Sequence, residues 1–152
     1  MSFTVRRTTP LAPEQAFAAL TDVRRHAPFV PLTRAEPAAG PPHVGWFFDM
    51  VTGRGPLRVR DRMVVTAWEP GRRMRVVKTG RPIDGWADLR VRPAGAGAIV
   101  EWQVELGVRA PGLARLSRRV GDAVAPAMYA AVVDGVLAEA EAQASARAST
   151  GG

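Results

Sequence analysis

The sequence predicts an α+β fold in which a curved antiparallel sheet of six to seven strands wraps around one long C-terminal helix. Alternating strand patterns with turn signals cover roughly Val44 to Val108, and a helical pattern covers Pro111 to about Arg147. An antiparallel sheet can expose one face to water and pack the other. The central question for function is whether the helix seals the packed face or leaves a cavity.

Composition indicates a single globular domain. The chain has 152 residues, of which 47% are hydrophobic, enough to bury a core. We expect one domain over residues 1–147 and a flexible tail over residues 148–152. The segment that follows Met1 lacks the apolar stretch of a signal peptide. No apolar run is expected to span a bilayer, so we predict a cytoplasmic protein without a membrane span.

Metal and cofactor chemistry find no support in the sequence. There is no cysteine, and His26 and His43 are the only imidazoles, which is too few for a usual zinc site. There is no GxSxG motif around Ser117, and no P-loop, GxGxxG or HExxH motif. We therefore expect no metal and no cofactor.

The net charge is strongly basic, at +7 from 21 Lys and Arg against 14 Asp and Glu. Such a charge suits nucleic acid, a membrane surface or acidic ligands. Lys78 is the only lysine, and the arginines are spread over many elements. A solvated basic surface is therefore favoured over a nucleic-acid footprint.

The N-terminal part predicts one strand followed by two short helices. Phe3–Thr9 is the strand, and Pro13 with Glu14 suits the first turn of a helix. Ala12 is a poor cap, so this helix should depend on packing of its apolar face; that face holds Phe17, Leu20 and Val23. A second short helix is expected at Arg24–Phe29, and Glu36–Pro42 is a loop or a short edge connection.

The central part predicts a meander of antiparallel strands, separated by glycine and proline turns. The expected strands are Val44–Val51, Leu57–Trp68, Met74–Thr79, Trp86–Arg92 and Ala98–Arg109. Matching apolar faces predicts the last hairpin register, which pairs Leu89 with Trp102, Ala87 with Val104, Val91 with Val100, and Arg90 with Glu101. A one-residue slip would bury Glu101 and Glu105.

The Pro70-Gly71 turn predicts the register of the strands beside it. If Glu69 opposes Arg72, then Val65 opposes Val76 and Met63 opposes Lys78. The same register pairs Ala67 with Met74, and places Trp68 against Arg73 as a cation–π pair.

The C-terminal helix is expected to carry an apolar stripe and a break. The stripe contains Leu113, Leu116, Val120 and Val124, and continues through Tyr129, Val132, Val133, Val136, Leu137 and Ala140. Pro126 should kink or interrupt the helix. Ala144–Gly152 is small and polar, and is expected to fray.

This order of elements resembles the helix-grip fold of the START-like (SRPBCC) superfamily. Local phrases are similar too: Thr9–Phe17 resembles the entry into the first helix, Asp22–Thr33 the second helix, and Val59–Met74 and Gly85–Leu106 the central hairpins. The closest branch is that of the polyketide cyclases and dehydrases. The resemblance implies a deep pocket between the sheet and the last helix, which would hold a lipid, polyketide or isoprenoid. These motifs report fold more than chemistry.

Four polar residues are candidate catalytic groups. Asp61 interrupts an apolar face, and the register places Lys78 diagonal to it, within reach of a long side chain. The two could bind the polar end of a ligand or move protons. The favoured alternatives are a structural ion pair, or a β-bulge that turns Asp61 outward. His26 is a candidate base or anchor, although a helix-cap or surface histidine is more common. Tyr129 could reach a ligand or sit in the core.

A larger apolar set is the candidate pocket lining, with ordinary core packing as the alternative. Because Pro126 should disturb the helix, the pocket is expected near Pro126–Val133. The candidate ligand-binding residues are Trp46, Phe48, Val59, Met63, Val65, Val76, Leu89, Trp102, Val104, Met128 and Val132. Asp49 lies beside Phe48, on a face that the pattern does not fix, and solvent exposure is favoured for it.

Three functions follow from these patterns. The first is binding of a hydrophobic small molecule between the sheet and the helix. The second is a cyclase, aromatase or dehydratase that acts on a polyketide-like substrate in the same pocket. The third is an interaction module whose basic surface meets ribosomal RNA or a membrane. A homodimer is left open as well.

Overall fold

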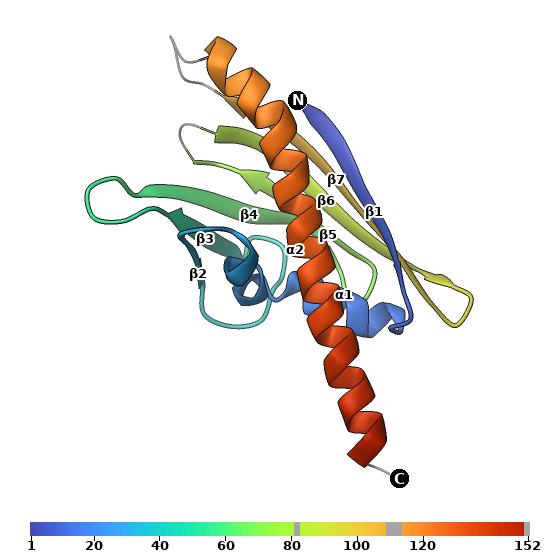
Figure 1. The fold of residues 1–152 in the computed structure, drawn as a ribbon. Helices are drawn as coiled ribbons and strands as arrows, with labels where there is room; N and C mark the ends of the chain where they lie inside the picture. The colour runs from blue at the N-terminus through green and yellow to red at the C-terminus, as the bar shows by residue number, and fades with distance from the viewer. Residues whose placement is uncertain (81–82, 109–113, 151–152) are drawn as a thin grey trace.

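The fold is a seven-stranded antiparallel sheet with a long helix across one face (Figure 1). The structure is a computed structural model, and it describes residues 1–80, 83–108 and 114–150. The strand order is β1-β7-β6-β5-β4-β3-β2. The strands are β1 (Ser2–Thr9), β2 (Thr33–Pro37), β3 (Phe47–Thr52), β4 (Val59–Glu69), β5 (Arg73–Lys78), β6 (Ile83–Ala94) and β7 (Gly97–Val108). The helices are α1 (Pro13–Thr21), η1 (Val23–Arg25), η2 (Ala27–Phe29) and α2 (Ala114–Thr150). The predicted α+β fold is confirmed.

The short helices after β1 follow the expected pattern, with one refinement. α1 begins after Ala12, whose backbone N–H donates to the Gln15 side chain at 3.1 Å. Its apolar face is buried, with Phe17 at 3% and Leu20 at 0% exposure, so tertiary packing stabilises it as expected. The predicted second helix is two 3-10 turns, η1 and η2.

Strand β2 is an edge strand, whose last two residues fall in the segment Glu36–Pro42 that was expected to be a loop or a short edge connection. It pairs with β3 along its full length, from Thr33 opposite Thr52 to Pro37 opposite Phe48. Pro37 is its last residue, and a proline is tolerated at the end of an edge strand because the outer side needs no donor.

The registers are confirmed in one hairpin and partly wrong in the other. All four predicted pairs between β6 and β7 are present. Between β4 and β5, Met63–Lys78 and Val65–Val76 are present, but the register then shifts by one. A β-bulge at Thr66 leaves that residue unpaired. The shift places Trp68 opposite Met74 and its ring 5.2 Å from Phe17, so the predicted pairing of Trp68 with Arg73 is wrong.

Helix α2 runs without a break from Ala114 to Thr150, with Pro126 inside it. An interruption at Pro126 is therefore wrong, and fraying from Ala144 stays a prediction. The predicted start at Pro111, and Leu113 of the stripe, lie outside the described residues. Buried contacts hold the second half of the helix, where Val133 and Val136 are both 0% exposed.

A glycine allows η2 to approach α2 closely. A Cβ atom built on Gly135 would lie 2.1 Å from the Phe29 ring, far inside van der Waals contact. Phe29 therefore packs directly on the α2 backbone at this point. α2 makes its main contacts with β1, β7, α1 and η2, so it lies on one side of the curved sheet.

One segment of α2 also meets the length and composition of a membrane span. Residues Ala123–Thr150 pass this test among the described residues, against the expectation from the sequence. The finding is weak evidence, because the core helix of a soluble protein passes the same test. Val132, Val133 and Val136 are buried in the core, although only 22% of the apolar window is buried in total.

Candidate functional site

The predicted pocket residues gather on the face of the sheet that α2 crosses, which we call the concave face. The registers place Phe48 beside Met63, Val65 beside Val76, and Leu89 beside Trp102. The buried members of the set are Trp46, Phe48, Met63, Val65, Val76, Leu89, Trp102, Val104 and Val132. Met128 is half-buried on α2, and Val59 is 44% exposed where β4 begins. The concave face is thus almost wholly apolar.

One buried ion pair interrupts this apolar face. Lys78 Nζ donates a hydrogen bond to Asp61 Oδ2 and lies 3.9 Å from Met63 Sδ. The Lys78 side chain is only 5% exposed and that of Asp61 16%. The other oxygen, Asp61 Oδ1, is buried and has no hydrogen-bond partner among the described residues. The alternative of a bulge at Asp61 does not apply, because the bulge lies at Thr66.

Two of the positions beside the Asp61–Lys78 pair are glycines. Gly85 on β6 is the strand partner of Lys78. A Cβ atom built on Gly80 would lie 3.4 Å from the Cα atom of Asp61. Gly85 has φ +130° and its Cβ would lie 1.9 Å from the Glu105 carbonyl oxygen, so only glycine fits there. The concave face therefore lacks side chains at both of these positions.

His26 is buried between the short helices and the sheet, at 7% exposure, so a surface position is wrong. Its Nε2–H donates to the Leu20 carbonyl oxygen at 2.8 Å, and its ring lies 5.6 Å from Trp102. Because a carbonyl only accepts, the neutral ring has its free lone pair on Nδ1. Burial lowers the pKa of His26 and outweighs the Leu20 carbonyl and Asp22, which both raise it. Burial therefore favours the neutral form of the imidazole.

Tyr129 belongs to a row of aromatic rings. It makes edge-to-face contacts with Trp102 and Phe3, each with 5.4 Å between ring centroids. Trp102 in turn contacts His26. The structure therefore brings His26 and Tyr129 into contact with one tryptophan on the concave face.

The described depressions lie away from the predicted pocket position. One of about 560 Å³ is lined by α1, the segment before β3 and the turn between β4 and β5, and includes Phe17, Trp46 and Trp68. Another of about 240 Å³ lies between α1 and the end of α2. Neither includes Pro126–Val133 or the Asp61–Lys78 pair. The pocket at Pro126–Val133 stays a prediction.

The opposite, convex face of the sheet is strongly charged. Asp49 is 2% exposed, so its expected solvent exposure is wrong. Arg62 and Arg60 cover it, with contacts of 2.8 Å and 2.5 Å. Hydrogen bonds from Arg62 are the main cause of the lowered pKa of Asp49. The arginine side chains bury the carboxylate that they pair with.

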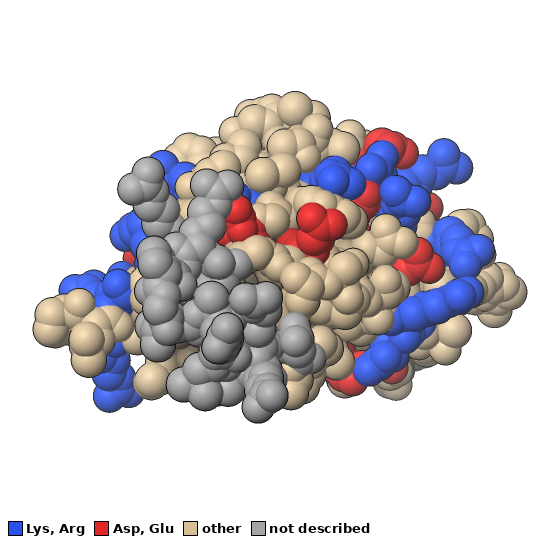
Figure 2. Space-filling view, turned by 90° about the horizontal axis from the view of Figure 1, so that it is seen from above, with Lys and Arg blue, Asp and Glu red and all other residues tan. Residues whose placement is uncertain are grey.

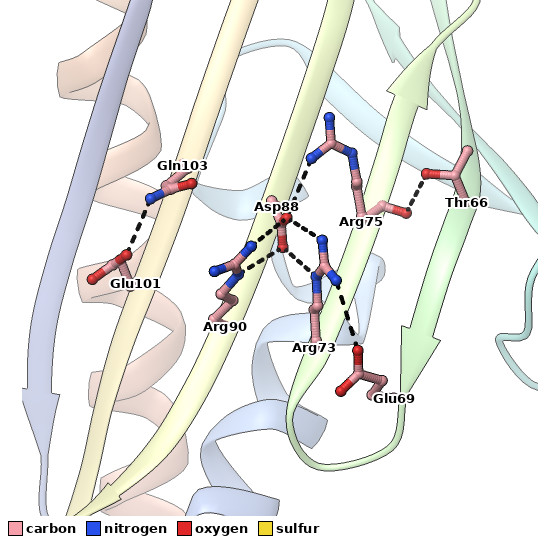
Figure 3. A network of polar contacts seen from close by, with 8 residues as sticks. All are labelled: Thr66, Glu69, Arg73, Arg75, Asp88, Arg90, Glu101 and Gln103. Carbon is pink, nitrogen blue, oxygen red and sulfur yellow. Dashed lines mark hydrogen bonds and ion pairs between the residues drawn. The ribbon is translucent and has the colours of Figure 1, made fainter.

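Asp88 is the centre of a second cluster on the convex face (Figure 3). Arg73, Arg75 and Arg90 all contact its carboxylate, Arg73 at 2.7 Å. Burial alone raises the pKa of Asp88, but hydrogen bonds from Arg73 and Arg90 outweigh it and lower the pKa. The sequence did not single out Asp88. The available signal was its spacing from Arg90, because residues two apart on a strand lie on the same face.

The arginines of the convex face are therefore partly neutralised. Figure 2 shows basic and acidic side chains beside one another on the face that it presents. Arg75 and Arg62 also lie over aromatic rings, 4.1 Å from Trp86 and 4.6 Å from Phe47. These contacts match the expected solvated basic surface more closely than a bare patch for nucleic acid.

Solved structures share this fold over nearly the whole chain. The protein TTHA0849 from Thermus thermophilus has a TM-score of 0.78 at 16% identity, covering 94% of this chain and 99% of that one. The Zhui aromatase/cyclase from Streptomyces sp. R1128 has a TM-score of 0.71 at 14% identity, covering 93% of each chain.

A larger protein contains the same unit. The di-domain ARO/CYC StfQ from the steffimycin biosynthetic pathway has a TM-score of 0.76 at 17% identity, covering 95% of this chain and 52% of that one. Identities this low establish the fold alone. No curated protein matches the sequence.

The family is established by the sequence itself. The family described as "Polyketide cyclase / dehydrase and lipid transport" matches residues 1–144. This agrees with the resemblance found in the sequence and with a fold suited to a hydrophobic-ligand pocket. The chain belongs to the polyketide cyclase/dehydrase and lipid transport family.

Proposed function

We propose that this protein binds a hydrophobic small molecule, such as a lipid, polyketide or isoprenoid, between the concave face and α2. The observation that carries the proposal is the apolar concave face, crossed by a helix whose main sheet contacts are with β1 and β7. Burying apolar ligand surface against such a face contributes about 25 cal/mol per Å². A ligand of this class gains affinity there without a charge partner.

Membership of the family supports the binding of a hydrophobic ligand, without naming which ligand. The ligand-binding residues would be the apolar set of the concave face together with Met128 and Val132 on α2. A cytoplasmic location and a homodimer stay predictions, and neither is needed for binding.

Uptake of a neutral fluorescent probe tests this function. N-phenyl-1-naphthylamine should brighten on binding and be displaced by lipids extracted from cells. Met128→Trp, on the half-buried side of α2, should reduce uptake by filling space. Ala131→Trp, on the exposed side, is the matched control and should not. Absence of uptake by the unmodified protein would reject the proposal. Native mass spectrometry of the purified protein would show the mass of any ligand that co-purifies.

A cyclase, aromatase or dehydratase reaction is a second candidate, which the geometry of His26 favours. Its Nε2–H is held by the Leu20 carbonyl, so Nδ1 is left as a base that could remove a proton from a polyketide-like chain. Asp61, Lys78 and Tyr129 would be the other proton-handling groups. Two of the similar structures are named aromatase/cyclase or ARO/CYC.

Product analysis separates the enzyme from the binder. A linear poly-β-ketone thioester cyclises spontaneously in buffer, and an enzyme would change the rate or the ring pattern. His26→Gln should return both to the values seen in buffer. An identical product pattern with and without the unmodified protein would leave binding as the function.

A further inference from the structure

The Asp61–Lys78 pair has an incomplete set of hydrogen bonds. Asp61 Oδ1 is buried without a partner among the described residues, although Oδ2 is paired with Lys78. A buried carboxylate oxygen without a donor loses its interaction with water and gains nothing in return. Lys78 Nζ has three N–H donors, one of which is used by Asp61 and one of which faces the weak acceptor Met63 Sδ.

The place of the pair in the apolar face limits what can complete it. Asp61 and Lys78 lie beside Met50, Met63 and Phe48 on the concave face. The positions of Gly80 and Gly85, also next to the pair, carry no side chain. No described side chain supplies the missing partner, which leaves a bound molecule or an ordered water; the apolar part of a bound molecule would lie on the methionines and the phenylalanine.

The unused groups are one acceptor, Asp61 Oδ1, and one donor, on Lys78 Nζ. A hydroxyl group has both a donor and acceptor lone pairs, so one hydroxyl can satisfy both. An ether or a ketone only accepts and leaves Oδ1 unpaired. A carboxylate accepts from Lys78 but has no donor for Oδ1, and an ammonium group donates to Oδ1 but leaves the free Lys78 donor without an acceptor.

We infer that the ligand of this site carries a hydroxyl group, as an alcohol, phenol or enol, that donates to Asp61 Oδ1 and accepts from Lys78 Nζ. This inference rests on the proposed function, because it names the polar end of the hydrophobic ligand. The pair is then an anchor for a neutral polar group, and discriminates against fatty acids and amines.

Four ligands with one chain length test the inference: 1-dodecanol, dodecyl methyl ether, dodecanoate and dodecylamine. Each displaces N-phenyl-1-naphthylamine from the unmodified protein in a titration. The alcohol should bind about tenfold more tightly than the ether, the size of one added hydrogen bond to a charged group. Dodecanoate and dodecylamine should bind more weakly than the alcohol.

The double variant Asp61→Leu/Lys78→Met should abolish the preference, so that alcohol and ether bind within about twofold of one another. The matched control, Arg7→Gln/Asp134→Asn, removes an ion pair between β1 and α2 that is 40% and 53% exposed. It should keep the preference.

The outcomes separate the two proposals. Equal affinity of the unmodified protein for alcohol and ether would overturn the hydroxyl inference and leave hydrophobic binding intact; an ordered water would then be the partner of Oδ1. A preference that survives in the double variant would overturn it too. If the probe and all four ligands fail to bind, the proposed function fails, and the inference fails with it.

Discussion

The two faces of the sheet use aspartate in opposite ways. On the convex face, Asp88 is surrounded by three arginines and both of its oxygens accept hydrogen bonds. On the concave face, Asp61 has a single partner, Lys78, and one oxygen without any among the described residues. A complete network stabilises one conformation of the sheet, whereas the incomplete one leaves a buried oxygen without a hydrogen-bond donor. The comparison predicts that the convex network contributes mainly to stability, and that the concave pair contributes to the proposed ligand binding.

The largest expected effect is on the convex face. Asp88→Asn removes the charge that holds Arg73, Arg75 and Arg90 together, and should lower the free energy of unfolding by about 3 kcal/mol. Urea denaturation measures it. Probe binding per folded molecule should not change, because Asp88 lies on the face away from α2. A loss of binding with unchanged stability would reverse the comparison.

Replacing the concave pair should have a smaller effect, of the opposite sign. Buried ion pairs are often less stabilising than apolar side chains of similar volume. The variant Asp61→Leu/Lys78→Met should therefore unfold at higher urea, with a gain of about 1 kcal/mol, while its preference for dodecanol is lost. A large loss of stability would make the Asp61–Lys78 pair a structural ion pair, like the cluster around Asp88.

The free energy of unfolding should fall in two separate pH ranges, one set by His26 and one by the buried aspartates of the convex face. Burial lowers the pKa of His26, so the unfolded chain binds a proton first, and stability should fall as the pH drops below about 6.5. The pKa values of Asp49 and Asp88 are lowered as well. Their stabilising contribution is complete above a pH of about 4 and is lost as the pH falls through their folded-state values.

Urea midpoints at three pH values, about 7.5, 5.5 and 3, would separate the two ranges. His26→Gln should abolish the fall between the first two values and keep the fall at acid pH. His43→Gln is the matched control, since His43 is exposed before β3, and it should keep both. A fall below a pH of about 6.5 that survives in His26→Gln would show that the histidine is not its cause.

The strand pattern was sufficient to predict the concave face, because alternation carries that information directly. Leu89 opposite Trp102 and Met63 opposite Lys78 are examples. The same pattern placed Asp61 on the apolar face, and the register placed Lys78 within reach of it. Neighbours on adjacent strands follow directly from the strand register, so they can be predicted without knowing how distant segments pack.

Features that depend on distant segments were not predictable in this way. The bulge at Thr66 is a one-residue shift that an alternating pattern does not mark. His26 is buried where the short helices meet Trp102 of β7, and two arginines fold over Asp49. Pro126 lies inside a continuous helix because packing of the following turns outweighs the local cost of proline.

The smallest expected effect is that of replacing Arg75 on the convex face, which tests whether its charge or its flat guanidinium group matters for stability. Arg75 lies 4.1 Å over the Trp86 ring and contacts Asp88 at 3.4 Å. Arg75→Lys keeps the charge but loses the flat guanidinium that stacks on the ring, and should cost about 0.5 kcal/mol. Arg58→Lys, on an exposed residue at the end of the β3–β4 connection, is the control and should cost less. If both changes cost the same, the convex network depends on charge alone, and Asp88 is held by electrostatics rather than by the geometry of its arginines.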